Sequence, residues 1–176
     1  MTDTSGPPRS PHQLLALMPY AVALGIELHE VTVTLVTGSL AWSPERCTAG
    51  GILHGGAIMS LADTVGGVCA FLNLPQGANT ATIDSTTRLY RPLRAGTLNA
   101  SARPVHTGRT TIVVATDMTD DEGHLVAQTS QVQAVITSKL ASRCEELSSS
   151  RIEGWNDSMP ADPGGRCPEV VINETR

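Results

Sequence analysis

The sequence predicts an α+β protein in which an antiparallel sheet wraps around one long helix. A single segment, roughly residues 55–73, repeats its apolar residues at helical spacing. The segments before and after it are short runs rich in β-branched residues, separated by proline and glycine. Because the later runs follow one another without an intervening helix, they are expected to pair as antiparallel strands.

The chain is expected to open with a flexible polar segment, residues 1–9, and then a short helix. Ser10 and Pro11 supply a cap and a first-turn proline for a helix over residues 12–17. Pro19 is expected to end this helix, since proline disrupts a helix interior.

Two strands are expected between Gly25 and the central helix. Over residues 31–37 valine and leucine alternate with threonine, as in a strand with one buried face. A second strand is expected over residues 40–42, and Pro44 ends it.

The segment 55–73 is expected to be the central helix. Its apolar stripe consists of Ile58, Leu61, Ala62, Val65, Cys69 and Leu72. Gly66 and Gly67 each cost about 1 kcal/mol relative to alanine in a helix, so they suggest close packing against a sheet or another backbone. Pro75 follows the helix and helps to end it.

Four further strands are expected after the helix. They cover residues 80–90, 97–106, 110–119 and 124–137. Residues 120–123, Asp-Asp-Glu-Gly, have the composition of a hairpin turn between the last two strands.

Residues 10–139 are expected to form one domain, and residues 140–176 a mobile tail with too few apolar residues to fold alone. A net charge of −5 argues against general nucleic-acid binding. No apolar run approaches the ~20 residues of a membrane span, and the N-terminus lacks a signal peptide's basic start and apolar core. We therefore expect no nucleic-acid or membrane partner and a cytoplasmic location.

A glycine-rich turn, residues 50–56, leads directly into the central helix. The N–H groups near Gly55 and Gly56 lie at the positive helix end, which suits an anion or a polarised carbonyl oxygen. Asp63 lies further along the same helix. At ~1.5 Å per residue, Gly55 and Asp63 are about 12 Å apart along the axis, so one helix cannot deliver both to one carbon atom. We therefore expect Gly55 of one subunit to act with Asp63 of another.

These residues carry a family resemblance. His54-Gly55-Gly56, followed after six residues by Asp63, resembles the HGG…D signature of hotdog-fold acyl-CoA thioesterases. Residues 90–96 are similar to that family's strand end and turn, and residues 106–110 to its next hairpin. The resemblance covers residues 20–137 and favours the phenylacetate-degradation (PaaI-type) subgroup. It implies a hotdog fold that hydrolyses an acyl- or aryl-CoA thioester to the free acid and coenzyme A.

The resemblance also implies catalytic roles. The Gly55 amide would polarise the thioester carbonyl, and Asp63 would act as nucleophile or as the general base that activates water. His54 would position the loop or the carbonyl, or would only pack the turn. Thr48 stands where the family often carries an asparagine or glutamine that orients water. Thr82 matches a serine or threonine that assists catalysis in some members of the family. It is equally well explained as an ordinary strand residue.

Coenzyme A is expected as part of the substrate, with no separate cofactor and no metal. The resemblance favours Gly108 and Arg109 nearest the nucleotide or pantetheine, then Arg91 and Arg94, with Gly56 at the helix start. Each arginine taken singly could equally form a surface salt bridge. Family members are built as homodimers, often paired into tetramers, which implies active sites shared between subunits.

Two alternatives remain open at this stage. One is a hotdog hydratase or dehydratase, although the longer histidine motifs of those enzymes are not seen. The other is a non-catalytic acyl-CoA-binding or sensor protein. This alternative stays open because position 48 carries threonine in place of the family's asparagine or glutamine. Few aromatic residues are present, so the acyl pocket is expected to be lined by aliphatic and small side chains, whatever the acyl group.

Overall fold

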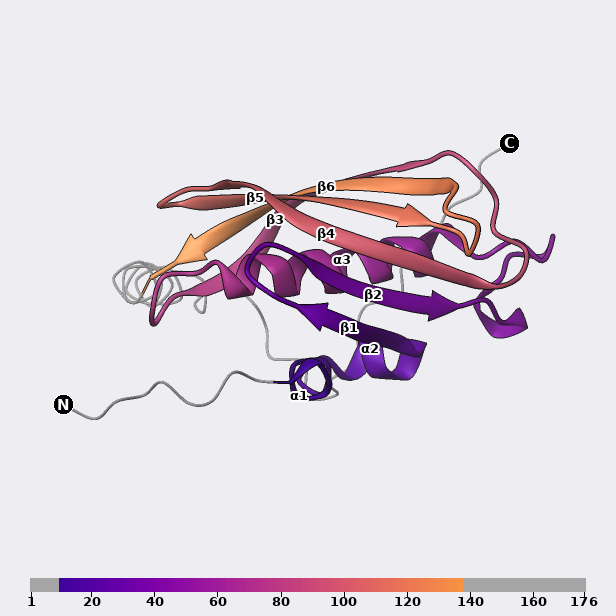
Figure 1. The fold of residues 1–176 in the computed structure, drawn as a ribbon, viewed down its shortest axis with the longest axis horizontal. Helices are drawn as coiled ribbons and strands as arrows, with labels where there is room; N and C mark the ends of the chain where they lie inside the picture. Colours follow the sequence, from indigo (N-terminus) through magenta and orange to yellow (C-terminus); the bar gives the residue numbers. More distant parts are fainter. Residues whose placement is uncertain (1–9, 138–176) are drawn as a thin grey trace, which may run out of the picture. The chain divides into compact units, whose positions relative to one another are not determined.

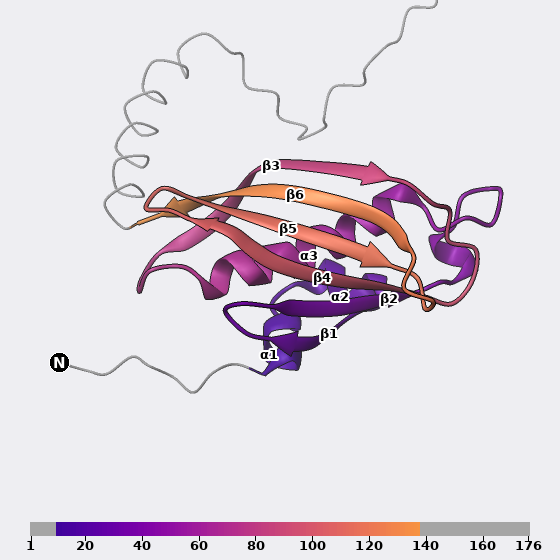
Figure 2. The ribbon, with the colours of Figure 1, turned by 45° about the horizontal axis from the view of Figure 1, so that its top comes forward.

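A computed structural model describes residues 10–137. Six antiparallel strands form one sheet in the order β1-β2-β4-β5-β6-β3, and the sheet curves around α3 (Figures 1 and 2). The strands are β1 (Ile26–Val31), β2 (Val36–Ala41), β3 (Asn79–Leu89), β4 (Thr97–Thr107), β5 (Thr111–Thr119) and β6 (Leu125–Ile136). The predicted α+β class is confirmed. The predicted segments 1–9 and 140–176 lie outside the described residues.

Two short helices precede the sheet, where one was predicted. Helix α1 (Pro11–Leu15) begins as expected, with a capping box formed by Ser10 and Gln13. The prediction that Pro19 only ends a helix was wrong, because Pro19 is the first residue of α2 (Pro19–Leu24). A proline at this position loses no intrahelical hydrogen bond, since the first N–H groups of a helix have no partner within it.

The strand predicted over residues 31–37 is interrupted by a turn, because β1 ends at Val31, β2 begins at Val36, and residues 32–35 connect them. The backbone N–H and the hydroxyl of Thr32 both donate to the Leu35 carbonyl, at 2.9 Å each. Such side-chain bonds compete with a strand ladder and favour a turn. The alternation of apolar residues with threonine therefore identified residues that favour β-structure, but it did not reveal the turn between two strands. A 3-10 turn, η1 (Pro44–Arg46), follows β2.

Helix α3 (Gly55–Leu72) occupies the concave side of the sheet and contacts all six strands. Ten of its residues are buried. Its 18 residues have a mean hydropathy of 1.5, which by length and composition alone would suit a membrane span. Packing against six strands accounts for this apolar character within the described part of the chain.

Two glycines let the helix and the sheet approach each other closely. A Cβ atom at Gly38 of β2 would lie 2.9 Å from the Val65 side chain of α3. A Cβ atom at Gly66 of α3 would overlap the amide of Gln131, a fully buried residue of β6. Gly67 behaves differently, since a Cβ atom there meets nothing within 4 Å. The close packing expected at both helix glycines is therefore confirmed for Gly66 alone.

The two adjacent glycines provide a matched test of this packing. Gly66→Ala should destabilise the protein by about 1–3 kcal/mol, because the added methyl group must displace the buried Gln131 amide. Gly67→Ala should stabilise it by up to about 1 kcal/mol, because alanine is the better helix former and has room here. Urea unfolding of both variants measures the difference, and equal stabilities would contradict the packing described.

Candidate active site

Asp63 is the acidic residue of α3, and its side chain faces the edge of the sheet formed by β6 and β3. Its Oδ1 atom accepts a hydrogen bond of 2.7 Å from Nε2 of Gln131 on β6. The same oxygen accepts a longer bond of 3.4 Å from the hydroxyl of Thr82 on β3. Oδ2 accepts none from residues 10–137. The structure therefore brings Asp63 and Thr82 together, as two of the predicted site residues.

The polar contacts continue along β3 and β6. Nε2 of Gln133 donates to the Thr82 hydroxyl at 2.9 Å, and the Thr80 hydroxyl donates to Oε1 of Gln133 at 3.2 Å. The pairing register of β3 with β6 shifts between Thr82 and Asp84, which marks a bulge beside Asp63. Bulges of this kind re-aim side chains and are common next to active sites.

A cavity of about 410 Å³ opens beside Asp63, large enough for a small ligand. Its apolar walls include Leu14 of α1, Met18 directly before α2 and Val68 of α3. Its polar end is formed by Asp63 with Thr80, Thr82 and Gln133. Tyr20 and Phe71 also line it, so the walls are less purely aliphatic than the composition suggested.

The start of α3 is capped by His54. Its Nδ1 atom accepts a hydrogen bond of 2.9 Å from the Gly56 N–H, so this nitrogen carries no proton. The Gly55 N–H has no acceptor among residues 10–137. Of the two amides expected to be free at this helix end, Gly56 is therefore occupied by the cap, and Gly55 remains available to a ligand.

Gly55 and Asp63 lie on the same helix, as expected, and do not meet within one chain. Their separation of eight residues corresponds to about 12 Å along the axis. A Cβ atom at Gly55 would lie 3.2 Å from Leu89, at the far end of β3 from Thr82. The described chain thus holds two separated groups, the Gly55 amide and the Asp63 carboxylate.

Thr48 lies in the turn that precedes α3. Its backbone N–H donates to the Ile52 carbonyl at 2.8 Å, and Cys47 bridges Leu53 beside it. The side chain is exposed, and its hydroxyl has no hydrogen-bond partner in the described part of the chain. Within one chain, Thr48 therefore makes no contact with Asp63.

The expected coenzyme A contacts lie at opposite ends of the sheet. Arg91 and Arg94 follow β3 near the start of α3, and Nη1 of Arg94 donates to the Gly50 carbonyl at 2.8 Å. Gly108 and Arg109 form the turn between β4 and β5 at the other end (Figure 1). These residues could act on one nucleotide only if they came from different subunits.

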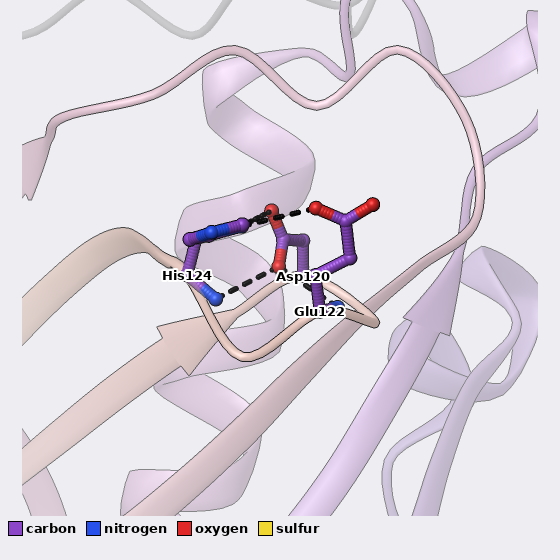
Figure 3. Close-up of side chains that lie close together, drawn as sticks. All are labelled: Asp120, Glu122 and His124. Carbon is purple, nitrogen blue, oxygen red and sulfur yellow. Dashed lines mark hydrogen bonds and ion pairs between the residues drawn. The ribbon is translucent and has the colours of Figure 1, made fainter.

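The turn between β5 and β6 contains a group that could hold a metal ion, formed by Asp120, Glu122 and His124 (Figure 3). Nδ1 of His124 lies 3.3 Å from a carboxylate oxygen of each acidic residue. Burial tends to raise the pKa of Asp120, but hydrogen bonds from the amides of His124 and Glu122 and from the His124 ring lower it overall.

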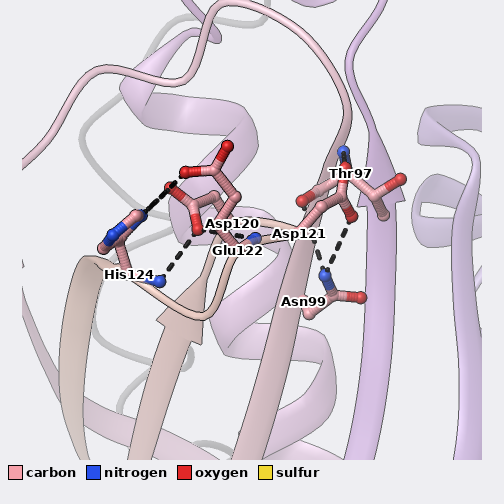
Figure 4. Close-up of polar contacts among 6 residues, drawn as sticks. All are labelled: Thr97, Asn99, Asp120, Asp121, Glu122 and His124. Atoms are coloured by element: carbon pink, nitrogen blue, oxygen red, sulfur yellow. Dashed lines mark hydrogen bonds and ion pairs between the residues drawn. The ribbon is translucent and has the colours of Figure 1, made fainter.

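The same turn has a structural explanation. Oδ1 of Asp120 accepts from the amides of Glu122 and His124, at 3.0 and 2.8 Å, which closes the turn. Asp121 accepts from the Thr97 amide at 2.9 Å and so ties the turn to β4 (Figure 4). The turn lies apart from Asp63, and its polar groups stabilise the hairpin.

Sequence reasoning missed Gln131 and Gln133. Both lie in the strand predicted over residues 124–137, where they alternate with the apolar residues Val132, Ala134 and Ile136. The structure buries the odd-numbered positions from 127 to 135, so both glutamines face α3. The available signal was Gly66, since a small residue on a buried helix face leaves room for a polar side chain from the sheet.

Comparisons with known proteins agree with the fold described above. A model of the Thioesterase superfamily matches residues 50–127. The sequence is 33% identical over 116 residues to "Putative esterase ComA2" of Bacillus subtilis, which covers 65% of this chain and 91% of that protein.

Two solved structures share the fold. The crystal structure of thioesterase HI1161 from Haemophilus influenzae has a TM-score of 0.70 at 26% identity, covering 74% of this chain and 92% of that one. The E. coli PaaI protein from the phenylacetic acid degradation operon has a TM-score of 0.66 at 25% identity, covering 71% and 89%. The comparisons confirm the PaaI-like hotdog fold and support thioester hydrolase activity.

Cys69 lies on the buried face of α3, and burial raises the pKa of its thiol to about 11. At pH 8 the thiol is therefore protonated and should react slowly with iodoacetamide, since the thiolate is the reactive form. Mass spectrometry of the folded protein should find Cys69 at least about tenfold less labelled than the half-buried Cys47. Urea should abolish the difference, and equal labelling of the folded protein would count against the burial of this thiol.

Proposed function

Because the chain belongs to the Thioesterase superfamily, we propose that it hydrolyses an acyl- or aryl-CoA thioester to the free carboxylic acid and coenzyme A. The observation that carries the proposal is the Asp63 carboxylate, which lies at the polar end of an otherwise apolar cavity. The cavity would receive the acyl or aryl group, and the carboxylate would face the thioester carbon.

The Gly55 amide would polarise the carbonyl group. It is the free donor at the first position of α3, where the helix dipole favours negative charge. A preorganised donor of this kind lowers the barrier to formation of the oxyanion by about 3 kcal/mol. His54 supports this role, because its cap occupies the neighbouring Gly56 amide and fixes the helix start.

Asp63 would act as general base or as nucleophile. As a base it takes a proton from water, the water oxygen attacks the carbonyl carbon, and the carbon–sulfur bond breaks. The departing sulfur of coenzyme A then receives the proton. As a nucleophile Asp63 attacks the carbonyl carbon, and the carbon–sulfur bond breaks to release coenzyme A as a thiolate, which takes up a proton. The mixed anhydride that remains is hydrolysed by water to the free acid and the Asp63 carboxylate. Thr82 would support the carboxylate in either case.

The site would be completed by a second copy of the chain. β3 is an edge of the sheet, and its Thr82, Ser85 and Leu89 face α3 yet are exposed. Leu89 is 54% exposed, and Met59 on the neighbouring face of α3 is 46% exposed. An unpaired edge with exposed apolar residues is a surface that another chain can cover. A homodimer on this surface would place Gly55 of one chain opposite Asp63 of the other.

The same dimer accounts for the distribution of the expected coenzyme A contacts. Arg91 and Arg94 of one chain would meet Gly108 and Arg109 of its partner, and arginine suits the phosphates through its paired N–H donors. Pairs of dimers would form a tetramer. Thr48 would lie beside the Gly55 site and supply one hydroxyl. No separate cofactor or metal enters the proposed reaction, and we propose a cytoplasmic location.

A thiol-release assay over short, medium and aromatic acyl-CoA substrates tests the reaction. Gly55→Pro removes the proposed donor, and proline is well accepted at the first position of a helix. Its kcat should fall about 10²–10³-fold, whereas Gly55→Ala, which keeps the N–H, should retain most activity. Asp63→Asn should lower kcat by about 10²–10⁴-fold.

The same assay separates the alternatives. Tight binding of acyl-CoA without thiol release would identify a binding or sensor protein. Loss of the enoyl-CoA absorbance without thiol release would identify a hydratase. Full activity of Asp63→Asn would contradict the role of this carboxylate.

Mixing two inactive variants tests the shared site. In a mixed dimer of Gly55→Pro and Asp63→Asn chains, one site combines both substitutions and the other has neither. Co-expression of the two should therefore restore about one working site per mixed dimer, measured by thiol release after purification with two different tags. A double variant mixed with itself is the control. If a dimer shown to contain both chains released no thiol above the control, the shared-site proposal would be contradicted.

A further inference from the structure

Gln131 is a fully buried polar residue in the contact between α3 and the sheet. Its Nε2 group donates to Oδ1 of Asp63 at 2.7 Å, which is the shorter of the two hydrogen bonds to this carboxylate. Its other amide atom, Oε1, is buried and has no hydrogen-bond partner in the described part of the chain. Contact with Asp63 is thus the polar interaction that its amide makes there.

This arrangement fixes which way the amide points. An ionised carboxylate only accepts hydrogen bonds, so the N–H₂ end must face Asp63 and the carbonyl end must face the interior. An unpartnered buried carbonyl costs stability, which a methionine or leucine at this position would avoid. The hydrogen bond to Asp63 is the interaction that only an amide at this position provides.

We propose that Gln131 is a positioning residue for Asp63, and that Oδ2 is the carboxylate oxygen that reacts. This inference rests on the proposed function. Gln131 from β6 and Thr82 from β3 both hold Oδ1, whereas Oδ2 receives no hydrogen bond from residues 10–137. Holding one oxygen sets the rotation of the carboxylate and directs the lone pairs of the other toward water or the thioester carbon.

Neighbouring residues keep Gln131 in place. Gly66 leaves space for its amide against the helix, where any larger residue would displace it. On the other side of Asp63, Gln133 holds the Thr82 hydroxyl through a bond of 2.9 Å. Both donors to Oδ1 are therefore themselves held by packing or by a hydrogen bond, as precise positioning requires.

Gln131→Met tests the proposal, because methionine has similar length and no N–H donor. We expect kcat for thioester hydrolysis to fall about tenfold or more, as for loss of a hydrogen bond to a charged group, with KM changed less than about twofold. The unfolding midpoint in urea should stay the same or rise, because the unpartnered carbonyl is removed. Gln131→Leu provides a second variant if methionine packs poorly.

Thr116→Val is the matched control. Thr116 on β5 is also fully buried and lies near the same face of Gly66. Its hydroxyl has no hydrogen-bond partner in the described part of the chain, so it makes no hydrogen bond to Asp63. Its replacement should leave kcat and KM within about twofold of the original values. A fall in kcat as large as that of Gln131→Met would show that any change in this packing region impairs the site, and would overturn a specific role for the Gln131 amide.

The contact can also be measured without activity. The side-chain amide signals of Gln131 in a ¹⁵N NMR spectrum, identified by their loss in Gln131→Met, should shift when Asp63 is replaced by alanine. Unshifted signals would overturn the proposal even if no acyl-CoA is hydrolysed. An active protein whose Gln131→Met variant keeps full kcat would overturn it while leaving the proposed function intact.

Discussion

Helix α3 packs closely against all six strands, and this packing organises both the core and the candidate site. The 18-residue helix can approach the sheet this closely only where its side chains are small, and Gly66 is such a position opposite β6. The same approach brings the amide of Gln131 within hydrogen-bond distance of Asp63. Core packing and the orientation of the candidate catalytic carboxylate are therefore determined by one contact between helix and sheet.

Much of the fold could be predicted from strong local patterns. α3 was predicted to within a residue at each end, and β3 to β6 to within about two, because helical spacing and turn residues both mark their limits. The failures lie near the N-terminus. Pro19 can end one helix or begin another, and threonines near Leu35 suit a strand or a side-chain-bonded turn. In both places local chemistry allows two structures, and contacts with the sheet select one.

The candidate site was predictable in part for a different reason. Gly55 and Asp63 stand in a recognisable motif, and helix geometry alone separates them. Gln131 belongs to no motif, and its polarity alone favours an exposed side chain. In a strand, a shift of one position exchanges the buried and exposed faces, so a weak alternation gives no reliable orientation. The space that Gly66 leaves on α3 accommodates Gln131, and so determines which face of β6 is buried there.

The His54 cap determines how many amide donors the start of α3 offers to a ligand. Nδ1 of the ring occupies the Gly56 N–H, and the Gly55 N–H has no acceptor among residues 10–137. A helix end with several open amides suits an anion with several oxygen atoms, such as a phosphate group. An end with one open amide suits a single oxygen atom, as in the carbonyl group of a thioester.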